Sequence, residues 1–188
     1  MIKIGVTGSI ASGKTTASKL LSKKRGRLFS ADKIVKELYK KKSFKSLVAK
    51  KLGLSLKTDF KKRLVLQILQ KKTTLKKLEK IIHPLVRREM FLFLRKNKSS
   101  KILFFEIPLL VESKLMGYFD TVIFIKAKKR LRLVRYNNKY GNPKLFFRLD
   151  QQQIKDSKKA KLCDHIVVNN GTLKVLKKKL FNIIKLYD

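Results

Sequence analysis

Cysteine, tryptophan and proline are scarce in this chain of 188 residues, which has one cysteine, no tryptophan and three prolines. Because Cys163 stands alone, no intramolecular disulfide can form and an oxidising compartment is not indicated. No apolar run approaches the roughly 18 residues that cross a bilayer, and the first residues lack the apolar run and cleavage site of a signal peptide. We therefore expect a cytoplasmic protein without a membrane span.

Histidine is also rare, with His83 and His165 as the only two in the sequence. They lie far apart along the chain, so neither a metal-ligand spacing nor a serine-histidine-acid arrangement is supported. The sequence gives no basis for a metal site built on histidine or for a triad hydrolase.

Acidic residues are the third scarcity, with 12 against 49 lysines and arginines, which gives a formal net charge of +37. A polyanion partner is one explanation, and a general drift towards lysine on the surface is the other. The lysines run from Lys3 to Lys185 without a basic tail or a confined stripe. This spread favours the surface explanation over specific nucleic-acid binding, although the field would still steer anionic substrates.

The remaining composition is that of a globular protein, with 44% apolar and 32% charged residues. The length favours one domain, 1–188, with inserted lobes. Short apolar runs predict strands, and apolar spacings of three and four predict helices. We predict strands at 2–6, 27–29, 102–106, 121–125 and 166–168, and helical segments at 14–24, 33–97, 128–136, 144–162 and 172–187, with a new helix starting at Pro84. This alternation predicts a three-layer α/β core with a mostly parallel five-stranded sheet and a helical insertion at 33–98.

The strongest motif is the segment Gly8-Ser9-Ile10-Ala11-Ser12-Gly13-Lys14-Thr15, which follows the first strand and opens the first helix. It matches the P-loop pattern, in which glycines let successive backbone N–H groups turn towards phosphate oxygens. Lys14 is expected to reach the β- and γ-phosphates of ATP, and the Thr15 hydroxyl to ligate Mg²⁺. The predicted ATP-binding residues of this segment are Gly8, Ala11, Ser12, Gly13, Lys14, Thr15 and Thr16.

Two acids follow predicted strands. Asp32 comes just after the second strand, where a carboxylate can take the proton of an acceptor hydroxyl or cap the next helix, and its position alone leaves both open. Glu106 ends the third strand, a usual place for an acid that holds Mg²⁺, and we favour that role over capping the turn into Pro108.

Arginines of the smaller insertion are the candidates for stabilising charge on the transferring phosphoryl group, Arg135 and Arg148 foremost. In a chain this cationic, each arginine taken singly is more typical of a solvated surface than of a site. His83 can bond an acceptor substrate or sit in a turn, and the residues leave both open.

A series of short motifs runs along the whole chain: the P-loop, Ser-Ala-Asp at 30–32, Arg63-Leu64, His83-Pro84-Leu85, the run from Glu106 to Glu112, Arg148 with Gln152, and the segment 163–171. With these motifs the chain resembles the dephospho-coenzyme A kinases. The histidine-proline-leucine element, the proline-leucine-leucine element ending in Glu112 and the asparagine-glycine turn, in this order, are much more specific than the P-loop.

The resemblance implies transfer of the ATP γ-phosphate to the ribose 3′-hydroxyl of dephospho-coenzyme A, giving coenzyme A and ADP. It makes Asp32 the base, with Lys14 and Arg148 as the other catalytic residues. It further implies that the helical insertion binds the acceptor through Asp32, Arg63 and His83, that Asn169 lies against the adenine, and that 136–160 forms a lid.

Three features depart from the family pattern. Ser30 stands where the family has its first aspartate, and the arginines at 130, 132 and 135 are offset from the usual spacing. The lid also lacks the usual arginine-aspartate pair. Other small-molecule kinases of the same core, acting on a nucleoside monophosphate, and a nucleic-acid-binding NTPase remain the alternative functions. We expect ATP and dephospho-coenzyme A as partners and a monomer, with an oligomer left open.

Overall fold

The computed structural model describes residues 1–56 and 59–187. The chain forms two compact units: Met1–Ser30 with Phe93–Asp188, here called the sheet unit, and Ala31–Leu92, here called the helical unit. Lys57 and Thr58, inside the range predicted for the insertion, lie outside the described residues, as does Asp188.

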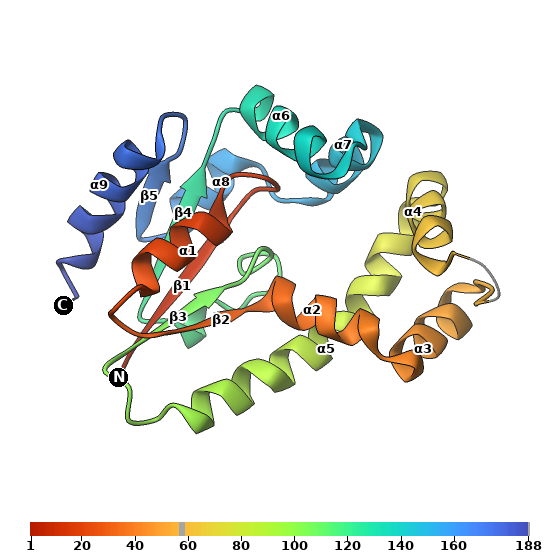
Figure 1. The fold of residues 1–188 in the computed structure, drawn as a ribbon, viewed down its shortest axis with the longest axis horizontal. Coiled ribbons are helices and arrows are strands. Elements are labelled where there is room, and N and C mark those ends of the chain that lie inside the picture. Colours follow the sequence, from red (N-terminus) through yellow and green to blue (C-terminus); the bar gives the residue numbers. More distant parts are fainter. Residues whose placement is uncertain (57–58, 188) are drawn as a thin grey trace. The chain divides into compact units, whose positions relative to one another are not determined.

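One parallel sheet organises the sheet unit (Figure 1). Its strands are β1 (Ile2–Gly8), β2 (Arg27–Ser30), β3 (Ile102–Glu106), β4 (Thr121–Lys126) and β5 (His165–Val168), in the spatial order β2-β3-β1-β4-β5. All four pairings are parallel, which confirms the predicted five-stranded parallel sheet. Val6 and Ser30 both pair with Glu106, so the ends of β1, β2 and β3 meet at one edge of the sheet.

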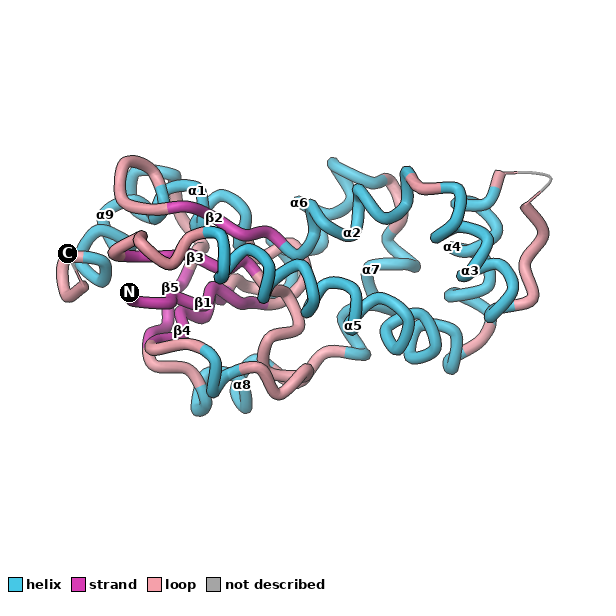
Figure 2. The backbone as a smooth tube through the Cα atoms, turned by 90° about the horizontal axis from the view of Figure 1, so that it is seen from below, coloured by secondary structure: helices cyan, strands magenta, loops and turns pink. Residues whose placement is uncertain are grey.

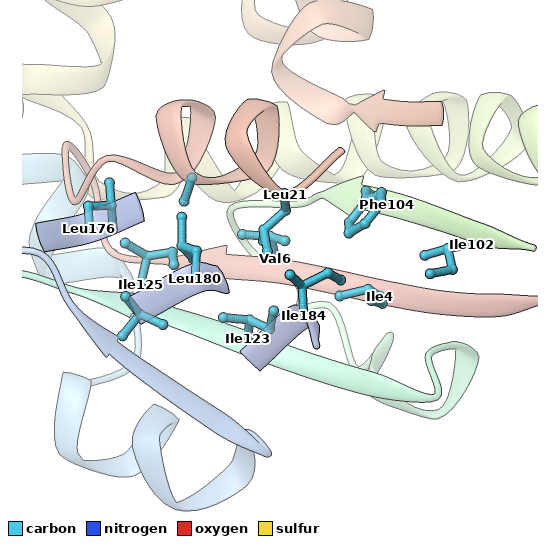
Figure 3. Packing of buried hydrophobic residues seen from close by; sticks show 12 residues of the cluster. Ile4, Val6, Leu21, Ile102, Phe104, Ile123, Ile125, Leu176, Leu180 and Ile184 are labelled. Carbon is cyan, nitrogen blue, oxygen red and sulfur yellow. The ribbon is translucent and has the colours of Figure 1, made fainter. Parts of the chain in front are cut away.

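Alternation along the strands sends one set of apolar side chains to each face. On one face, Ile4, Val6, Phe104, Ile123 and Ile125 are all fully buried. They pack against helices α1 (Lys14–Ser22) and α9 (Leu173–Ile184), which contribute Ala17, Leu21, Leu176, Leu180 and Ile184 to the same cluster (Figure 3). This packing fixes α1, and with it the loop that precedes the helix, against β1.

The opposite face carries an aromatic cluster. Phe105 of β3 lies 5.5 Å from Phe93, 5.9 Å from Phe29 and 5.2 Å from Phe119, measured between ring centroids. Helix α8 (Asp156–Leu162) lies on the side of the sheet away from α1 and α9 (Figure 2). Helices therefore cover both faces, and the predicted three-layer α/β core is confirmed.

The segment between β4 and β5 differs from its prediction. Helix α6 (Lys129–Tyr140) runs further than expected, and Gly141, with a φ of 62°, ends it in the left-handed conformation that glycine adopts at little cost. Asn142 then accepts a hydrogen bond from the Leu145 amide and starts α7 (Pro143–Gln152). The predicted turn-rich break at 137–143 is thus shortened to 141–142. The single helix predicted over 144–162 is also wrong, because residues 153–155 separate α7 from α8.

In its described residues the helical unit contains α2 (Ala31–Lys40), α3 (Lys42–Leu52), α4 (Phe60–Gln70) and most of α5 (Lys72–Lys96), which leads back to β3. The expectation that Pro84 begins a new helix is wrong, because Pro84 lies inside the 25-residue helix α5. Proline removes one helical N–H bond, but α5 has buried side chains on both sides of it, Leu78 before and Met90 after. Tertiary packing therefore outweighs the local cost. Among the helices of the described residues, none is long and apolar enough to cross a membrane.

Candidate active site

The P-loop lies between β1 and α1, as its sequence predicts. Helix α1 begins at Lys14 and has no acidic residue in its first turn, so its positive amino end is not neutralised from within the helix. Its first intrahelical bond runs from the Ala17 N–H to the Gly13 carbonyl. In an α-helix the amides of the first turn have no partner within the helix, and this end is therefore a usual place for an anion.

The Lys14 side chain is folded into this loop. It is only 8% exposed, and its Nζ donates to the Ser9 carbonyl at 3.0 Å. Burying an ammonium group is costly unless it is bonded, and here the bond is to the loop's own backbone, which keeps the lysine beside the phosphate-binding turn.

Two glycines of the loop have no room for a side chain. A Cβ on Gly8 would lie 2.4 Å from the Ile125 carbonyl oxygen of the neighbouring strand. Gly13 has a φ of 97°, and a Cβ there would lie 2.3 Å from Asn169 Nδ2. Both positions of the motif are therefore required by the geometry of the loop itself.

We predict that Gly13→Ala destabilises the protein by about 1–3 kcal/mol, because the backbone conformation is strained for any residue with a Cβ. It should also weaken ADP binding, because the side chain of Asn169 has to move away from the loop. Gly141→Ala is the control: its φ is 62°, and among the described residues no heavy atom lies within 4 Å of the added Cβ. Both substitutions should lower the melting temperature. Only Gly13→Ala should lower the ADP affinity measured by calorimetry. Equal ADP affinity in the two variants would contradict the prediction.

Glu106 lies at the edge of the sheet where β1, β2 and β3 end. Its side chain is buried, and its two oxygens accept hydrogen bonds from the hydroxyls of Thr15 and Ser30, the latter at 2.8 Å. Glu106 thus faces the first turn of α1. Ser30, at the end of β2, thus directly contacts the Glu106 carboxylate.

A carboxylate and a hydroxyl are oxygen ligands of the kind that Mg²⁺ prefers, and the ion usually completes its shell with phosphate oxygens and water. Among the described residues there is no group of three or more His, Cys, Asp or Glu side chains that could hold a metal on its own. The donor set at Thr15 and Glu106 therefore fits an ion that arrives with a phosphate.

Arg132 contacts the P-loop directly. It is 5% exposed, its Nε donates to the Ala127 carbonyl, and its Nη1 contacts the Ile10 carbonyl at 3.4 Å and the Asp150 carboxylate at 2.5 Å. Of the two arginines favoured from the sequence, Arg135 donates to the Asn169 carbonyl and Arg148 lies half-buried on α7.

Asn169 follows β5 and lies against the P-loop. Its Nδ2 donates to the Ser12 carbonyl at 2.9 Å, and its backbone N–H donates to the Lys126 carbonyl at 2.7 Å. The side chain thus braces the turn before α1. Its predicted contact with adenine stays a prediction.

The predicted acceptor residues belong to the helical unit. Asp32 is exposed and is the second residue of α2, so the alternative that it precedes and caps this helix is not supported. Arg63 is exposed on α4, and His83 is half-buried within α5. Burial, assisted by the nearby Arg87 guanidinium, lowers the pKa of His83 below its usual value of 6.5. Its imidazole is therefore neutral at pH 7 and suited to hydrogen bonding.

Cys163 gives no sign of reactivity. Its thiol is half-buried, and burial together with the Asp164 carboxylate raises its pKa to about 11. The reactive thiolate is therefore almost absent at neutral pH.

Comparison with known proteins decides the family. The family model for dephospho-CoA kinase matches residues 2–175. The chain belongs to the dephospho-CoA kinase family. A curated dephospho-CoA kinase from Fusobacterium nucleatum is 31% identical over 182 residues, 94% of each chain. A solved structure from Thermus thermophilus superposes with a TM-score of 0.77 at 25% identity, covering 100% of this chain and 98% of that chain. A dephospho-CoA kinase from Campylobacter jejuni does so with a TM-score of 0.65 at 25% identity, covering 97% and 95%.

Sequence reasoning missed several contacts that this member of the dephospho-CoA kinase family makes with its P-loop. Gln153 Oε1 accepts from the Ile10 N–H at 2.9 Å, and the Asp156 carboxylate accepts from the Ser9 hydroxyl. The sequence offered one signal for these contacts. The chain has only 12 acidic residues, and two of them, Asp150 and Asp156, lie close together before β5.

Proposed function

We propose that this chain transfers the γ-phosphate of ATP to the ribose 3′-hydroxyl of dephospho-coenzyme A, giving coenzyme A and ADP. The observation that carries the proposal is the P-loop at Gly8 to Thr15 with Lys14 buried inside it, in a chain that matches the family model over residues 2–175. Nucleotide chemistry follows from the loop, and the choice of acceptor follows from the family.

The P-loop would hold the phosphates of ATP through its backbone N–H groups and Lys14. Ser12 supports this assignment, because its side chain is fully buried and, within the described residues, its hydroxyl has no hydrogen-bond partner. A buried polar group without a partner is costly unless a ligand satisfies it. A phosphate oxygen in the loop would do so.

Thr15 and Glu106 would hold Mg²⁺, which neutralises charge on the phosphates when it is bound. Ser30 supports the position of Glu106 through its hydrogen bond. In this chain Ser30 brings no second carboxylate to the ion, so Glu106 would supply the negative charge at this edge of the sheet.

Asp32 would act as the base. It follows Ser30 by two residues, so connectivity alone keeps it near the end of β2. During transfer, a bond forms between the 3′ oxygen and the γ-phosphorus, the bond from that phosphorus to the β–γ bridging oxygen breaks, and the hydroxyl proton passes to Asp32.

Arg63 and His83 would bind the acceptor within the helical unit. The segment 136–160 would serve as the lid, with Arg148 stabilising charge on the transferring group.

The test is direct production of coenzyme A. Purified protein mixed with ATP, Mg²⁺ and dephospho-coenzyme A should yield coenzyme A and ADP in equal amounts. AMP offered as the acceptor in the same preparation should react far more slowly. Duplex DNA should bind only weakly and without saturation at physiological salt, because the cations are spread over the surface.

Three results would contradict the proposal. The absence of coenzyme A under conditions where ATP binds would exclude the proposed acceptor. Faster transfer to AMP would favour a nucleoside monophosphate kinase. ATP hydrolysis stimulated by DNA, with a steep salt dependence of binding, would favour a nucleic-acid-binding NTPase.

A further inference from the structure

Glu112 belongs to a motif that the proposed function leaves without a role. It lies in the loop that follows β3, and its side chain is 15% exposed. Its Oε1 forms an ion pair with Lys159 Nζ at 2.6 Å and accepts a hydrogen bond from the Ile154 N–H at 3.1 Å. Both contacting groups belong to the segment that runs from the end of α7 into α8.

Lys159 makes this pair unusual, because its side chain is fully buried in a protein whose lysines are mostly exposed. A buried ion pair contributes little net stability, since desolvation of the two charges offsets their attraction. Its best-attested use is to fix how neighbouring elements are placed. The question is therefore what the pair of Glu112 and Lys159 positions.

The pair positions residues 153–156, which contact the P-loop. Gln153 accepts from the Ile10 N–H, and Asp156 accepts from the Ser9 hydroxyl. Ile154, the residue held by Glu112, lies between them. This short linker is therefore bonded on one side to Glu112, which is paired with Lys159, and on the other side to the start of the P-loop.

The contacted residues matter because Lys14 depends on them. Lys14 Nζ donates to the carbonyl of Ser9, the residue whose hydroxyl is bonded to Asp156. Arg132 contacts the carbonyl of Ile10, the residue whose N–H is bonded to Gln153. A shift of the linker would therefore move the backbone that holds the phosphate-binding lysine.

We propose that Glu112, with Lys159, is a positioning residue for the P-loop, acting through Gln153 and Asp156 on Ser9 and Ile10. Neither partner needs to touch the nucleotide. The inference rests on the proposed nucleotide site but not on the identity of the acceptor.

The test replaces both charges together, because removing one would leave the other buried and unpaired. Glu112→Leu with Lys159→Met should remain folded, with a melting temperature near that of the wild type. Its ADP affinity should fall about tenfold, the effect expected when a supporting shell loosens a bound site. Glu112→Gln with Lys159→Met keeps an acceptor for the Ile154 N–H and should recover part of that affinity. In turnover assays, KM for ATP should rise while KM for the acceptor stays unchanged.

The matched control is Glu37→Leu with Lys40→Met, an exposed ion pair on α2 with a distance of 2.8 Å. It makes the same chemical change and should leave ADP affinity unaltered. Gln153→Ala provides a route that disturbs no ion pair, and it should also weaken ADP binding. When Gln153→Ala is combined with Glu112→Leu and Lys159→Met, ADP affinity should fall little further than in the more affected of the two parent variants, because both changes act through one linker.

Three outcomes would overturn the inference. One is a lowered melting temperature with wild-type ADP affinity in the folded double variant, which indicates a purely structural pair. Another is wild-type affinity in Gln153→Ala, which counts even if the double variant fails to fold. The third is that the losses of ADP binding free energy from Gln153→Ala and from the Glu112 and Lys159 changes add in full. A wild-type protein that does not bind ADP would instead contradict the proposed nucleotide site, so the two failures are distinguishable.

Discussion

Asp32→Asn is expected to bind ATP as the wild type does and to lose most of its turnover, about a thousandfold if Asp32 is the base. The amide keeps the size and hydrogen-bonding shape of the carboxylate but cannot take a proton at neutral pH. Because Asp32 is exposed near the start of α2, the substitution removes no core packing. Calorimetry with ATP and steady-state production of coenzyme A measure the two quantities separately.

Glu37→Gln is the control for this prediction, since Glu37 is an exposed carboxylate further along α2 and no role in the site is proposed for it. It should match the wild type in both measurements. Normal turnover in Asp32→Asn would remove Asp32 from the mechanism. Loss of ATP binding together with turnover would assign it to nucleotide binding instead of proton transfer.

The core of the fold was predictable because its signals are local. Buried parallel strands appear as short runs of Ile, Val and Phe, and β3 and β4 begin where those runs begin. The P-loop was equally clear, since its glycines, Lys14 and Thr15 are neighbours in sequence. Pro84 shows the limit of local reasoning, because the packing of α5 on both sides of it overrides an otherwise reliable helix boundary.

The contacts around the P-loop could not be predicted, because they join residues far apart in the chain. Gln153 and Ile10 are separated by 143 positions, and Asp156 and Ser9 by 147. No periodicity or spacing carries such information. The roles given to Arg63, His83 and Asn169 likewise came from the family resemblance, and the structure adds to Asn169 a bond to the P-loop that the resemblance did not imply.

The large positive charge of the chain lies mainly on its surface. Among the described residues, the buried cations are Lys14, Arg132 and Lys159. Arg132 and Lys159 are bonded to the carboxylates of Asp150 and Glu112. The other cations are partly or fully exposed and occur on both units. We expect the charge to act on the site mainly as a field that attracts anionic substrates and that salt screens.

Lys14→Met is expected to abolish nearly all activity, by about a thousandfold or more, while leaving the fold intact. The methionine fills much of the space of the lysine stem. Removing the buried ammonium group eliminates its desolvation cost and also its hydrogen bond to the Ser9 carbonyl, so the melting temperature should change little. ADP affinity should fall sharply, because the β-phosphate loses its charged partner.

Lys19→Met, an exposed lysine on the same helix, is the control and should change neither affinity nor turnover. A Lys14→Met protein that binds ADP normally would show that the lysine does not hold the phosphates. A Lys14→Met protein that unfolds would show that the ammonium group is needed to stabilise the loop itself. Compared with Asp32→Asn, which should lower turnover alone, Lys14→Met should lower binding and turnover together. The two variants thus separate the holding of the phosphates from the removal of the proton.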